Sequence, residues 1–347
     1  MFFIPEIDLD NIANHLASFK NIFKNKTFLV TGGTGFIGKW LVAALNRFEL
    51  NKKLNIDIYI LTRDIKSFKS QFSECPHIDN IHFIEGDIRS LHNLDNLKVE
   101  FNYIILGAND ATYDFSLNAK LLSETLIGGT FNLLDKFTSP KTEAIIHLSS
   151  GAVYGDISQH KNGAKETDQS LIDINNFGSM YGLSKALTES ILKQYGDQNN
   201  IRIINARCFA FVGPYLPLNK HFAIGNFINN CLNSEPIVIQ GNGLPVRSYM
   251  YAADMTKAIL QCLNTKSSMT INIGSDEKIS IKNLAILVSQ ILKNPNVVIK
   301  DQTNHHLEKA NYYLPDVSLL KSMDYKESNN LEISIQKTYD FYNDKRI

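Results

Sequence analysis

The hydrophobic pattern of this chain alternates between short continuous apolar runs and longer segments whose apolar residues recur at spacings of three and four. Continuous short runs are typical of parallel strands buried on both faces, and the second pattern is typical of amphipathic helices. The expected strands are Phe28–Val30, Asp57–Arg63, Ile81–Asp87, Tyr103–Ala108, Ala144–Ser150, Arg202–Arg207 and Ile271–Gly274. The expected helices are 8–24, Phe36–Phe48, Leu117–Phe137, Tyr181–Tyr195 and Ser280–Leu292. This alternation predicts a doubly wound α/β fold with a parallel sheet, and we expect helix 8–24 to cover the sheet.

A glycine-rich turn follows the first expected strand. The stretch Thr31-Gly-Gly-Thr-Gly-Phe-Ile-Gly38 has glycines between the strand and the next helix, and a further glycine inside that helix. Glycine allows backbone to turn tightly and to approach a phosphate closely, and a helix N-terminus attracts anions. The turn therefore predicts a site for a dinucleotide pyrophosphate. The residues expected there are Gly32, Gly35, Phe36, Ile37 and Gly38.

Composition narrows the range of partners. The 347 residues include 35 basic and 35 acidic side chains, so the zero net charge gives no electrostatic reason to expect nucleic acid or an anionic membrane. No apolar run of membrane-spanning length occurs, and no signal-peptide pattern follows Met1, which favours a cytoplasmic protein. The cysteines form no C-x-x-C pair, so we expect free thiols and no metal site; they are Cys75, Cys208, Cys231 and Cys262.

The ends of the next strands suggest which dinucleotide binds. Thr62 stands where an NAD-preferring protein usually has Asp, and Arg63 is suited to pair with a 2′-phosphate, so NADP(H) is favoured. If Asp64 instead takes the ribose diol, NAD(H) remains possible. We expect Asp87 to contact the adenine and the small residues after the fourth strand to leave room for the cofactor. The cofactor residues expected here are Thr62, Arg63, Asp87, Ile88, Gly107 and Ala108.

Candidate catalytic residues occur in Tyr181-Gly-Leu-Ser-Lys185. Residues four apart share one face of a helix, so the Lys185 ammonium is expected near the Tyr181 phenol. A nearby cation favours phenolate and lowers the pKa of a tyrosine, which makes it usable as an acid and base near neutral pH. Lys185 is also able to hold the nicotinamide ribose. Ser149 or Ser150, at the end of the fifth strand, is expected to hydrogen-bond the reacting oxygen.

Taken together, these motifs resemble the extended short-chain dehydrogenase/reductases of the nucleotide-sugar epimerase and dehydratase group. Besides the glycine turn and Tyr181-x-x-x-Lys185, the matching stretches are Gly86-Asp87, Ser149–Gly155, Arg207–Pro214, Arg247–Asp254 and Asn272-Ile-Gly274. The resemblance implies a Rossmann-type domain over residues 1–213, which includes helix 8–24 and receives residues 248–275. It also implies a smaller substrate-binding domain within 214–347 and a homodimer formed through the helices 117–137 and 181–195.

The resemblance also implies the roles of individual residues. Tyr181 becomes the acid and base, Lys185 its partner and Ser150 the third member of the catalytic set, counted back from Val153-Tyr154-Gly155. Arg247 and Asn226 are implied to contact the diphosphate of a nucleotide sugar. His221 is a further candidate for contact with the sugar.

One departure from the group's pattern bears on the reaction. Dehydratases of the group have Thr-Asp-Glu before Val-Tyr-Gly, whereas this chain has Ser150-Gly151-Ala152, and decarboxylases also use a glutamate where Ala152 stands. The expected reaction is therefore hydride transfer at a hexose carbon of an NDP-sugar, usually C4, by an epimerase or a 4-ketoreductase. A 4,6-dehydratase that takes its acid from Asp156 or Glu166 is the alternative. A dinucleotide-binding sensor or scaffold without catalysis is an alternative of another class.

Overall fold

The computed structural model describes residues 4–70, 80–94, 96–109, 118–220, 222–294, 296–300 and 311–344. The chain divides into two compact units that interleave along the sequence. The first unit comprises Met1–Val153, Ile172–Arg207 and Thr256–Ile271. The second comprises Tyr154–Leu171, Cys208–Met255 and Asn272–Ile347. Each unit is therefore assembled from segments that lie far apart in the chain.

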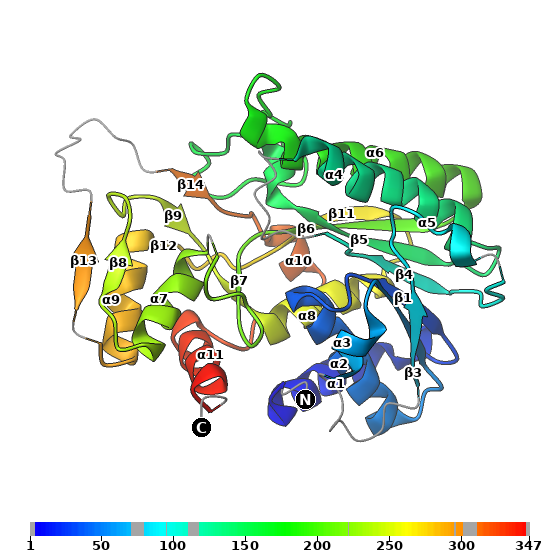
Figure 1. Cartoon of the computed structure of the whole chain (residues 1–347), viewed down its shortest axis with the longest axis horizontal. Coiled ribbons are helices and arrows are strands. Elements are labelled where there is room, and N and C mark those ends of the chain that lie inside the picture. Colours follow the sequence, from blue (N-terminus) through cyan, green and yellow to red (C-terminus); the bar gives the residue numbers. More distant parts are fainter. Residues whose placement is uncertain are drawn as a thin grey trace. The chain divides into compact units, whose positions relative to one another are not determined.

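The first unit is built on a seven-stranded sheet with the order β3-β2-β1-β4-β5-β6-β11 (Figure 1). The strands are β1 (Thr27–Thr31), β2 (Asp57–Thr62), β3 (Ile81–Glu85), β4 (Tyr103–Leu106), β5 (Ala144–Ser150), β6 (Arg202–Cys208) and β11 (Met269–Ile273). β1 pairs in parallel with both β2 and β4, and the pairs β2–β3 and β4–β5 are also parallel. The strand order reverses between β1 and β4, which is where doubly wound sheets bind ligands. The predicted Rossmann-type α/β fold is confirmed.

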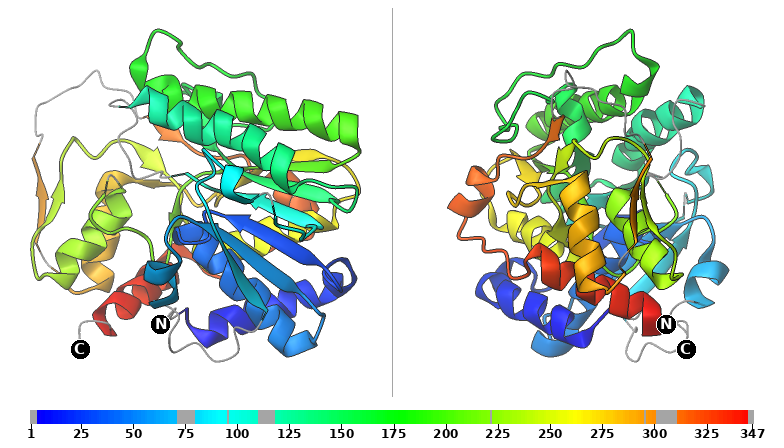
Figure 2. Two further views of the ribbon diagram at one scale, coloured as in Figure 1. Left: turned by 45° about the vertical axis from the view of Figure 1, so that its right-hand side comes forward. Right: turned by 90° about the vertical axis from the view of Figure 1, so that its left-hand side faces the viewer.

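Helices cover both faces of this sheet, as the apolar strands require. α2 (Phe36–Lys52) lies on one face, and α5 (Gly129–Phe137) and α6 (Met180–Asn199) lie on the other (Figures 1 and 2). Leu133, Leu134 and Phe137 of α5 join the buried cluster that contains strand residues such as Ile104 and Ile145. A single sheet therefore holds the glycine turn and the predicted catalytic helix on rigid elements.

The helix predicted over 117–137 is regular only in part. The structure has α4 (Ala119–Ser123), a π-helical turn at Glu124–Gly128 and then α5, and residue 117 lies outside the described residues. Gly129 packs against Ile88, since a Cβ there would lie 3.0 Å from the isoleucine side chain. The close approach of this segment to the end of β3 depends on that glycine.

The leading segment has a different role from the one predicted. α1 (Glu6–Leu16) is followed by a 3-10 turn at Ala17–Ile22, and α1 packs on α2 rather than on the sheet. The guanidinium of Arg47 donates to both oxygens of Asp10, at 2.7 and 2.8 Å. The end of the segment reaches the sheet, where the Phe23 ring stacks on Phe28 of β1 and Ile22 O accepts from the Tyr103 hydroxyl of β4.

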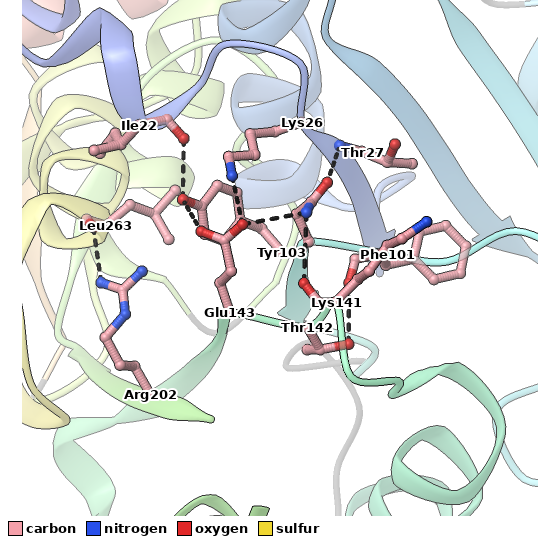
Figure 3. A network of polar contacts seen from close by, with 11 residues as sticks. Ile22, Lys26, Thr27, Phe101, Tyr103, Lys141, Thr142, Glu143, Arg202 and Leu263 are labelled. Atoms are coloured by element: carbon pink, nitrogen blue, oxygen red, sulfur yellow. Dashed lines mark hydrogen bonds and ion pairs between the residues drawn. The ribbon is translucent and has the colours of Figure 1, made fainter. Parts of the chain in front are cut away.

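A polar network closes the amino-terminal edge of the sheet (Figure 3). The Glu143 carboxylate, just before β5, pairs with the Lys26 ammonium and accepts from the Tyr103 hydroxyl and the Asn102 amide. Burial and the Glu143 charge raise the pKa of Tyr103, which stays neutral, and its single hydroxyl proton lies within hydrogen-bond distance of both the Glu143 carboxylate and Ile22 O. The network thus ties the leading segment to two central strands, at the edge opposite the glycine turn.

Replacing Glu143 by alanine is expected to lower the free energy of unfolding by about 2 kcal/mol, because a carboxylate that satisfies three partly buried donors is removed. Chemical denaturation monitored by circular dichroism measures the change. Glu100→Ala is the matched control, because Glu100 forms an ion pair with Lys141 between exposed side chains and is expected to leave the midpoint nearly unchanged. Equal effects of the two substitutions would contradict a special role for the network.

The second unit contains small sheets and four helices among its described residues. Its strands form the sets β10–β7, β12–β9–β14 and β13–β8. They are β7 (Phe211–Val212), β8 (Ile237–Ile239), β9 (Val246–Arg247), β10 (Met250–Tyr251), β12 (Ile279–Ser280), β13 (Val297–Ile299) and β14 (Tyr312–Tyr313). Its helices are α7 (Ala223–Leu232), α9 (Ile281–Ile291), α10 (Ser318–Ser322) and α11 (Leu331–Asp344). Ser280 caps α9, since its hydroxyl accepts from Asn283 N. The remaining helix, α8 (Ala252–Gln261), begins in the second unit and ends in the first.

Candidate active site

The glycine turn brings backbone into unusually close contact. Gly32 has φ +72°, and a Cβ on it would lie 2.3 Å from Gly107 O, while a Cβ on Gly38 would lie 2.1 Å from Gly32 O. Both distances are far below any contact that a real Cβ makes, so only glycine fits at these two positions. Gly35, the N-cap of α2, has no side chain to occupy the helix end. The turn is a backbone cradle at a helix N-terminus, which is chemically suited to a phosphate.

Thr31 fixes this cradle to the neighbouring strand. Its hydroxyl oxygen accepts from the backbone N–H groups of Gly107 and Ala108, at 3.0 and 3.1 Å, and donates to Ile105 O. Thr31 is buried, so these bonds are shielded from water. The ends of β1 and β4 are thereby held together at the point where the strand order reverses, and the small residues predicted there lie beside the glycine turn.

The adenosine candidates lie at the ends of β2 and β3. Thr62 is buried and its hydroxyl accepts from Asp64 N, whereas Arg63 is exposed. The Asp87 carboxylate accepts from the guanidinium of Arg89 at distances down to 2.5 Å, and this contact, helped by the charge of Arg63, lowers the pKa of Asp87. Ile88 is buried next to it. This end of the sheet therefore presents an ionised carboxylate with two arginines nearby.

Tyr181 and Lys185 lie on one face of α6, as the spacing predicted. The Lys185 ammonium lies 6.0 Å from the centre of the Tyr181 ring and donates to Leu148 O of β5 at 2.6 Å. Lys185 is only 3% exposed. A buried ammonium beside a phenol stabilises the phenolate form, which is the arrangement that proton transfer through Tyr181 requires.

The two serines that the strand pattern left open have different partners. The Ser149 hydroxyl donates to Glu189 Oε1 at 2.5 Å, inside the first unit. The Ser150 hydroxyl oxygen accepts from Ala152 N at 3.1 Å at the end of β5. Because the one proton of the Ser149 hydroxyl is committed to a buried carboxylate, Ser150 is the better candidate to donate to a reacting oxygen.

Three side chains at this site were not anticipated from the sequence. The amide of Asn109, three residues beyond β4, donates to the Tyr181 hydroxyl at 3.4 Å. Glu189 lies one helical turn beyond Lys185 and binds the guanidinium of Arg207 from β6, with a shortest distance of 2.7 Å. The only sequence signal for Glu189 was its four-residue spacing from Lys185, which ordinary surface helices also show.

A buried histidine, His147, lies within electrostatic range of Lys185. His147 of β5 is 1% exposed, and its Nδ1 lies 3.1 Å from Asn205 Oδ1 of β6. Burial, with the Lys185 charge as a smaller cause, holds the pKa of His147 well below its usual value. The imidazole is therefore neutral at physiological pH, and the charge of Lys185 contributes to this.

The candidates for substrate contact belong to the second unit. Asn226 lies in α7 and Arg247 in β9, while His221 falls outside the described residues. The half-buried Arg247 donates to Val246 O and Asn311 O and stacks over the ring of Tyr313, with 5.6 Å from its Cζ to the ring centroid. Burial lowers the pKa of Arg247. These partners are neutral, so the guanidinium charge is suited to an anion.

Two residues from the stretches that carried the resemblance, Asn272 and Asp254, form hydrogen bonds that stabilise the second unit. Asn272, fully buried, accepts from the Tyr154 hydroxyl at 2.7 Å and donates to Ala164 O and Asp316 O. The Asp254 carboxylate accepts from Ser328 N and from both the backbone and the side chain of Asn329. Both residues therefore organise the second unit.

Other predicted features concern metals, cysteines and membranes. Among the described residues no group of three or more His, Cys, Asp or Glu could hold a metal ion. Cys208, Cys231 and Cys262 are buried and form no disulfide among the described residues, and Cys75 lies outside these residues. In the described parts of the chain, no helix combines the length and the apolar character needed to cross a bilayer.

Comparison with known proteins gives concordant results. The family model of the "NAD dependent epimerase/dehydratase family" matches residues 28–274. UDP-glucuronic acid decarboxylase 6 of Arabidopsis thaliana is 28% identical over 302 residues, which cover 86% of this chain and 83% of that protein. A trifunctional UDP-glucose 4,6-dehydratase/UDP-4-keto-6-deoxy-D-glucose 3,5-epimerase/UDP-4-keto-L-rhamnose-reductase of the same plant is 27% identical over 335 residues, 92% of this chain and 47% of that protein.

Solved structures agree on the fold. UDP-N-acetylglucosamine 4-epimerase from Methanobrevibacter ruminantium M1, in complex with UDP-N-acetylmuramic acid, superposes with a TM-score of 0.76. The sequences are 23% identical, and the match covers 93% of this chain and 99% of that one. At this identity the similarity establishes the architecture, and the reaction has to be argued from the site itself.

Proposed function

Because the chain belongs to the NAD dependent epimerase/dehydratase family, we propose that it is an enzyme that moves a hydride at a hexose carbon of a nucleotide-diphosphate sugar. The reaction is epimerisation or net reduction of a 4-keto sugar. The observation that supports this proposal is the hydrogen bond of the Lys185 ammonium to Leu148 O, two residues before Ser150, from the helix face that also carries Tyr181 and in the same unit as the backbone cradle of Gly32 and Gly38.

The residues of the cradle fit a bound dinucleotide. The close backbone contacts at Gly32 and Gly38 leave room for no side chain, and the N-terminus of α2 offers N–H groups to a pyrophosphate. Gly107 and Ala108 border the same position, and Lys185 would hold the nicotinamide ribose. When bound, the dinucleotide supplies the acceptor or donor of the hydride.

The protein's own groups handle the proton and the orientation of the sugar. Tyr181 takes the proton from the sugar oxygen, or returns it, at the phenol oxygen. Lys185 stabilises the phenolate, and Ser150 donates a hydrogen bond to the same sugar oxygen. Asn109 adds a further donor on the phenol oxygen, at 3.4 Å in the structure. A positioned acid and base of this kind accelerates proton transfer by about 10²–10⁴-fold.

A nucleotide sugar is the proposed substrate class. Arg247 supports the choice, because its half-buried guanidinium faces backbone carbonyls and a tyrosine ring and is suited to the two negative charges of a diphosphate. The relatives whose names mention UDP-sugars point to the same class. Asn226 and His221 are proposed as further contacts of the substrate.

Water elimination is a poorer fit to the site. Positions 151 and 152 are Gly and Ala, so they offer no carboxyl next to Ser150. Asp156 is bonded to Ser158, which lowers its pKa and makes it a poor proton donor near neutral pH, and Glu166 accepts from Asn272 N. The dehydratase and the noncatalytic binding protein therefore remain alternatives with less support.

NADP(H) is the proposed dinucleotide within this NAD dependent family. Arg63 is exposed at the end of β2, and the buried Thr62 next to it offers no carboxylate to a ribose diol. A reductive cycle with NADPH consumed would follow from this preference. An epimerase would instead keep its dinucleotide through the cycle, so protein that retains NAD after purification would point to epimerisation.

Replacing Arg63 by alanine is expected to weaken NADP+ binding about 10- to 100-fold, because one charge-assisted contact contributes roughly 1.5–3 kcal/mol. NAD+ binding is expected to change less than threefold. Isothermal titration calorimetry with both dinucleotides measures the two constants. Lys66→Ala removes another exposed cation three residues away and is expected to alter neither. Tighter binding of NAD+ than of NADP+ by the unaltered protein would contradict the proposed preference.

The reaction itself is tested with a panel of probes. The protein is incubated with UDP-glucose, UDP-N-acetylglucosamine, UDP-glucuronic acid or UDP-4-keto-6-deoxy-glucose, with NADPH or NAD+, and the sugars are separated by chromatography. An epimer, or a 4-hydroxy product formed with consumption of NADPH, is the expected result. A 4-keto-6-deoxy product from UDP-glucose would establish the dehydratase instead. No turnover with any probe, despite dinucleotide binding, would favour the noncatalytic alternative.

We also propose that two copies associate through α5 and α6. Each helix leaves one large apolar side chain exposed, Phe131 at 49% and Leu187 at 47%. Exposed apolar residues on adjacent helices are suited to a self-complementary interface. Sedimentation velocity gives the mass of the particle and tests this association.

A further inference from the structure

We propose that Glu189, anchored by Arg207, is a positioning residue that holds the end of β5 against α6 and thereby fixes the Ser150 hydroxyl relative to Tyr181 and Lys185. This inference rests on the proposed function, since Glu189 acts through Ser150. Every group involved lies in the first unit. Nothing in the glycine turn or in the Tyr181–Lys185 spacing requires such a residue.

Two successive turns of α6 hold two consecutive residues of β5. Tyr181, Lys185 and Glu189 are spaced by four residues and therefore share one face of the helix. The Lys185 ammonium donates to Leu148 O at 2.6 Å, and the Glu189 carboxylate accepts from the Ser149 hydroxyl at 2.5 Å. The helix that carries the proposed acid is thus fastened to the strand that carries the proposed hydroxyl donor.

Arg207 holds the Glu189 carboxylate by a two-point contact. Its Nε lies 3.1 Å from Oε1 and its Nη2 lies 2.7 Å from Oε2, so the pair is bidentate. The side chains of Glu189 and Arg207 are 10% and 15% exposed. A carboxylate buried to this degree is retained only with a paired cation, and the two-point contact fixes its plane. The Glu189 carboxylate that accepts from Ser149 is therefore held in place by Arg207 of β6.

Ser150 directly follows Ser149 in the chain, so the position of Ser150 depends on where Ser149 is held. The Ser150 hydroxyl oxygen already accepts from Ala152 N, so its orientation depends on the backbone of residues 149–152. A displacement of about 1 Å at a reacting group costs about 100-fold in rate. Releasing Ser149 from Glu189 is therefore expected to move Ser150 far enough to slow the chemical step while the dinucleotide site stays intact.

The first test needs no substrate. Ser149→Ala removes only the contact to β5 and leaves the Glu189–Arg207 pair in place, so the fold is expected to persist. Hydrogen–deuterium exchange of the backbone of residues 149–153 is expected to accelerate about tenfold. Thr188→Val is the matched control, because it removes a buried hydroxyl of the same helix that donates to Ser184 O and not to β5. It is expected to leave exchange in residues 149–153 unchanged.

The second test uses the UDP-sugar that the panel shows to be converted. Ser149→Ala and Glu189→Asp are each expected to lower kcat about 10- to 100-fold with KM and the dinucleotide dissociation constant within twofold. Ser149→Thr keeps the hydroxyl and is expected to retain most of the kcat of the unaltered protein. In a Ser150→Ala background, Ser149→Ala is expected to have no further effect on kcat, because the group through which it acts is gone.

Besides full activity of Ser149→Ala and Glu189→Asp, two results would overturn the inference. One is unchanged exchange of residues 149–153 in Ser149→Ala. The other is a loss in kcat that persists undiminished in the Ser150→Ala background. If Tyr181→Phe and Ser150→Ala strongly lower kcat while Ser149→Ala and Glu189→Asp are fully active, the proposed function stands and only the role of Glu189 is lost. Full activity of Tyr181→Phe would instead remove the proposed function.

Discussion

Tyr181→Phe is expected to lose about 1,000-fold in kcat and to keep its affinity for the dinucleotide, because only the oxygen that exchanges the proton is removed. The ring of Tyr181 stays in place beside the Lys185 ammonium, 6.0 Å away in the unaltered protein. Steady-state kinetics with the converted UDP-sugar and calorimetry with the dinucleotide measure the two quantities separately. A loss confined to kcat identifies a group that acts in the chemical step.

A tyrosine on the same helix provides the control. Tyr195 lies far along α6, and its hydroxyl shares a 2.6 Å hydrogen bond with Thr138 Oγ1 of the first unit. Tyr195→Phe also removes one phenol oxygen and is expected to leave kcat within twofold of the unaltered protein. Full activity of Tyr181→Phe, or an equal loss in both variants, would refute the role assigned to Tyr181.

Gly38→Ala is expected to weaken dinucleotide binding more than about 100-fold and to lower the free energy of unfolding by about 1–3 kcal/mol, as overpacked sites do. The added Cβ would lie 2.1 Å from Gly32 O and 2.6 Å from Gly33 Cα. Neither neighbour has room to retreat, because Gly32 itself lies against the carbonyl of Gly107. The N-terminus of α2 has to move outward, away from the proposed position of the pyrophosphate.

Gly128→Ala is the matched substitution. Gly128 also lies in a helical conformation, with φ −59° and ψ −44°, and nothing lies within 4 Å of the Cβ that alanine would add. The Gly128→Ala variant is expected to bind the dinucleotide with unchanged affinity. Its stability is expected to be equal or slightly higher, because alanine has a higher helix propensity than glycine. Thermal unfolding with and without dinucleotide compares the two variants. Normal dinucleotide binding by Gly38→Ala would place the pyrophosphate elsewhere.

Local pattern was sufficient to predict most of the fold of the first unit. The apolar runs at β1, β2, β4, β5 and β6 are short and continuous, and strands covered on both faces need such runs. The glycine turn and the four-residue spacing of Tyr181 and Lys185 are also local features, because neighbours in sequence create them. The packing partner of the leading segment was harder to predict, because an apolar stripe shows that one face of a helix is buried but does not show which element it packs against. α1 packs on α2 and not on the sheet.

By itself, the sequence determined the doubly wound fold, the cradle for a dinucleotide and the helix that presents Tyr181 and Lys185. Only the tertiary structure decided what Ser149 and Ser150 bond to, and it alone revealed that Glu189 and Arg207 fasten α6 to β5 and that Asn109 reaches the Tyr181 hydroxyl. The physical reason is distance along the chain. Ser149 and Glu189 are 40 residues apart, and Asn109 and Tyr181 are 72 apart. Hydrogen bonds over such separations depend on strand order and helix packing, which no local pattern of residues encodes.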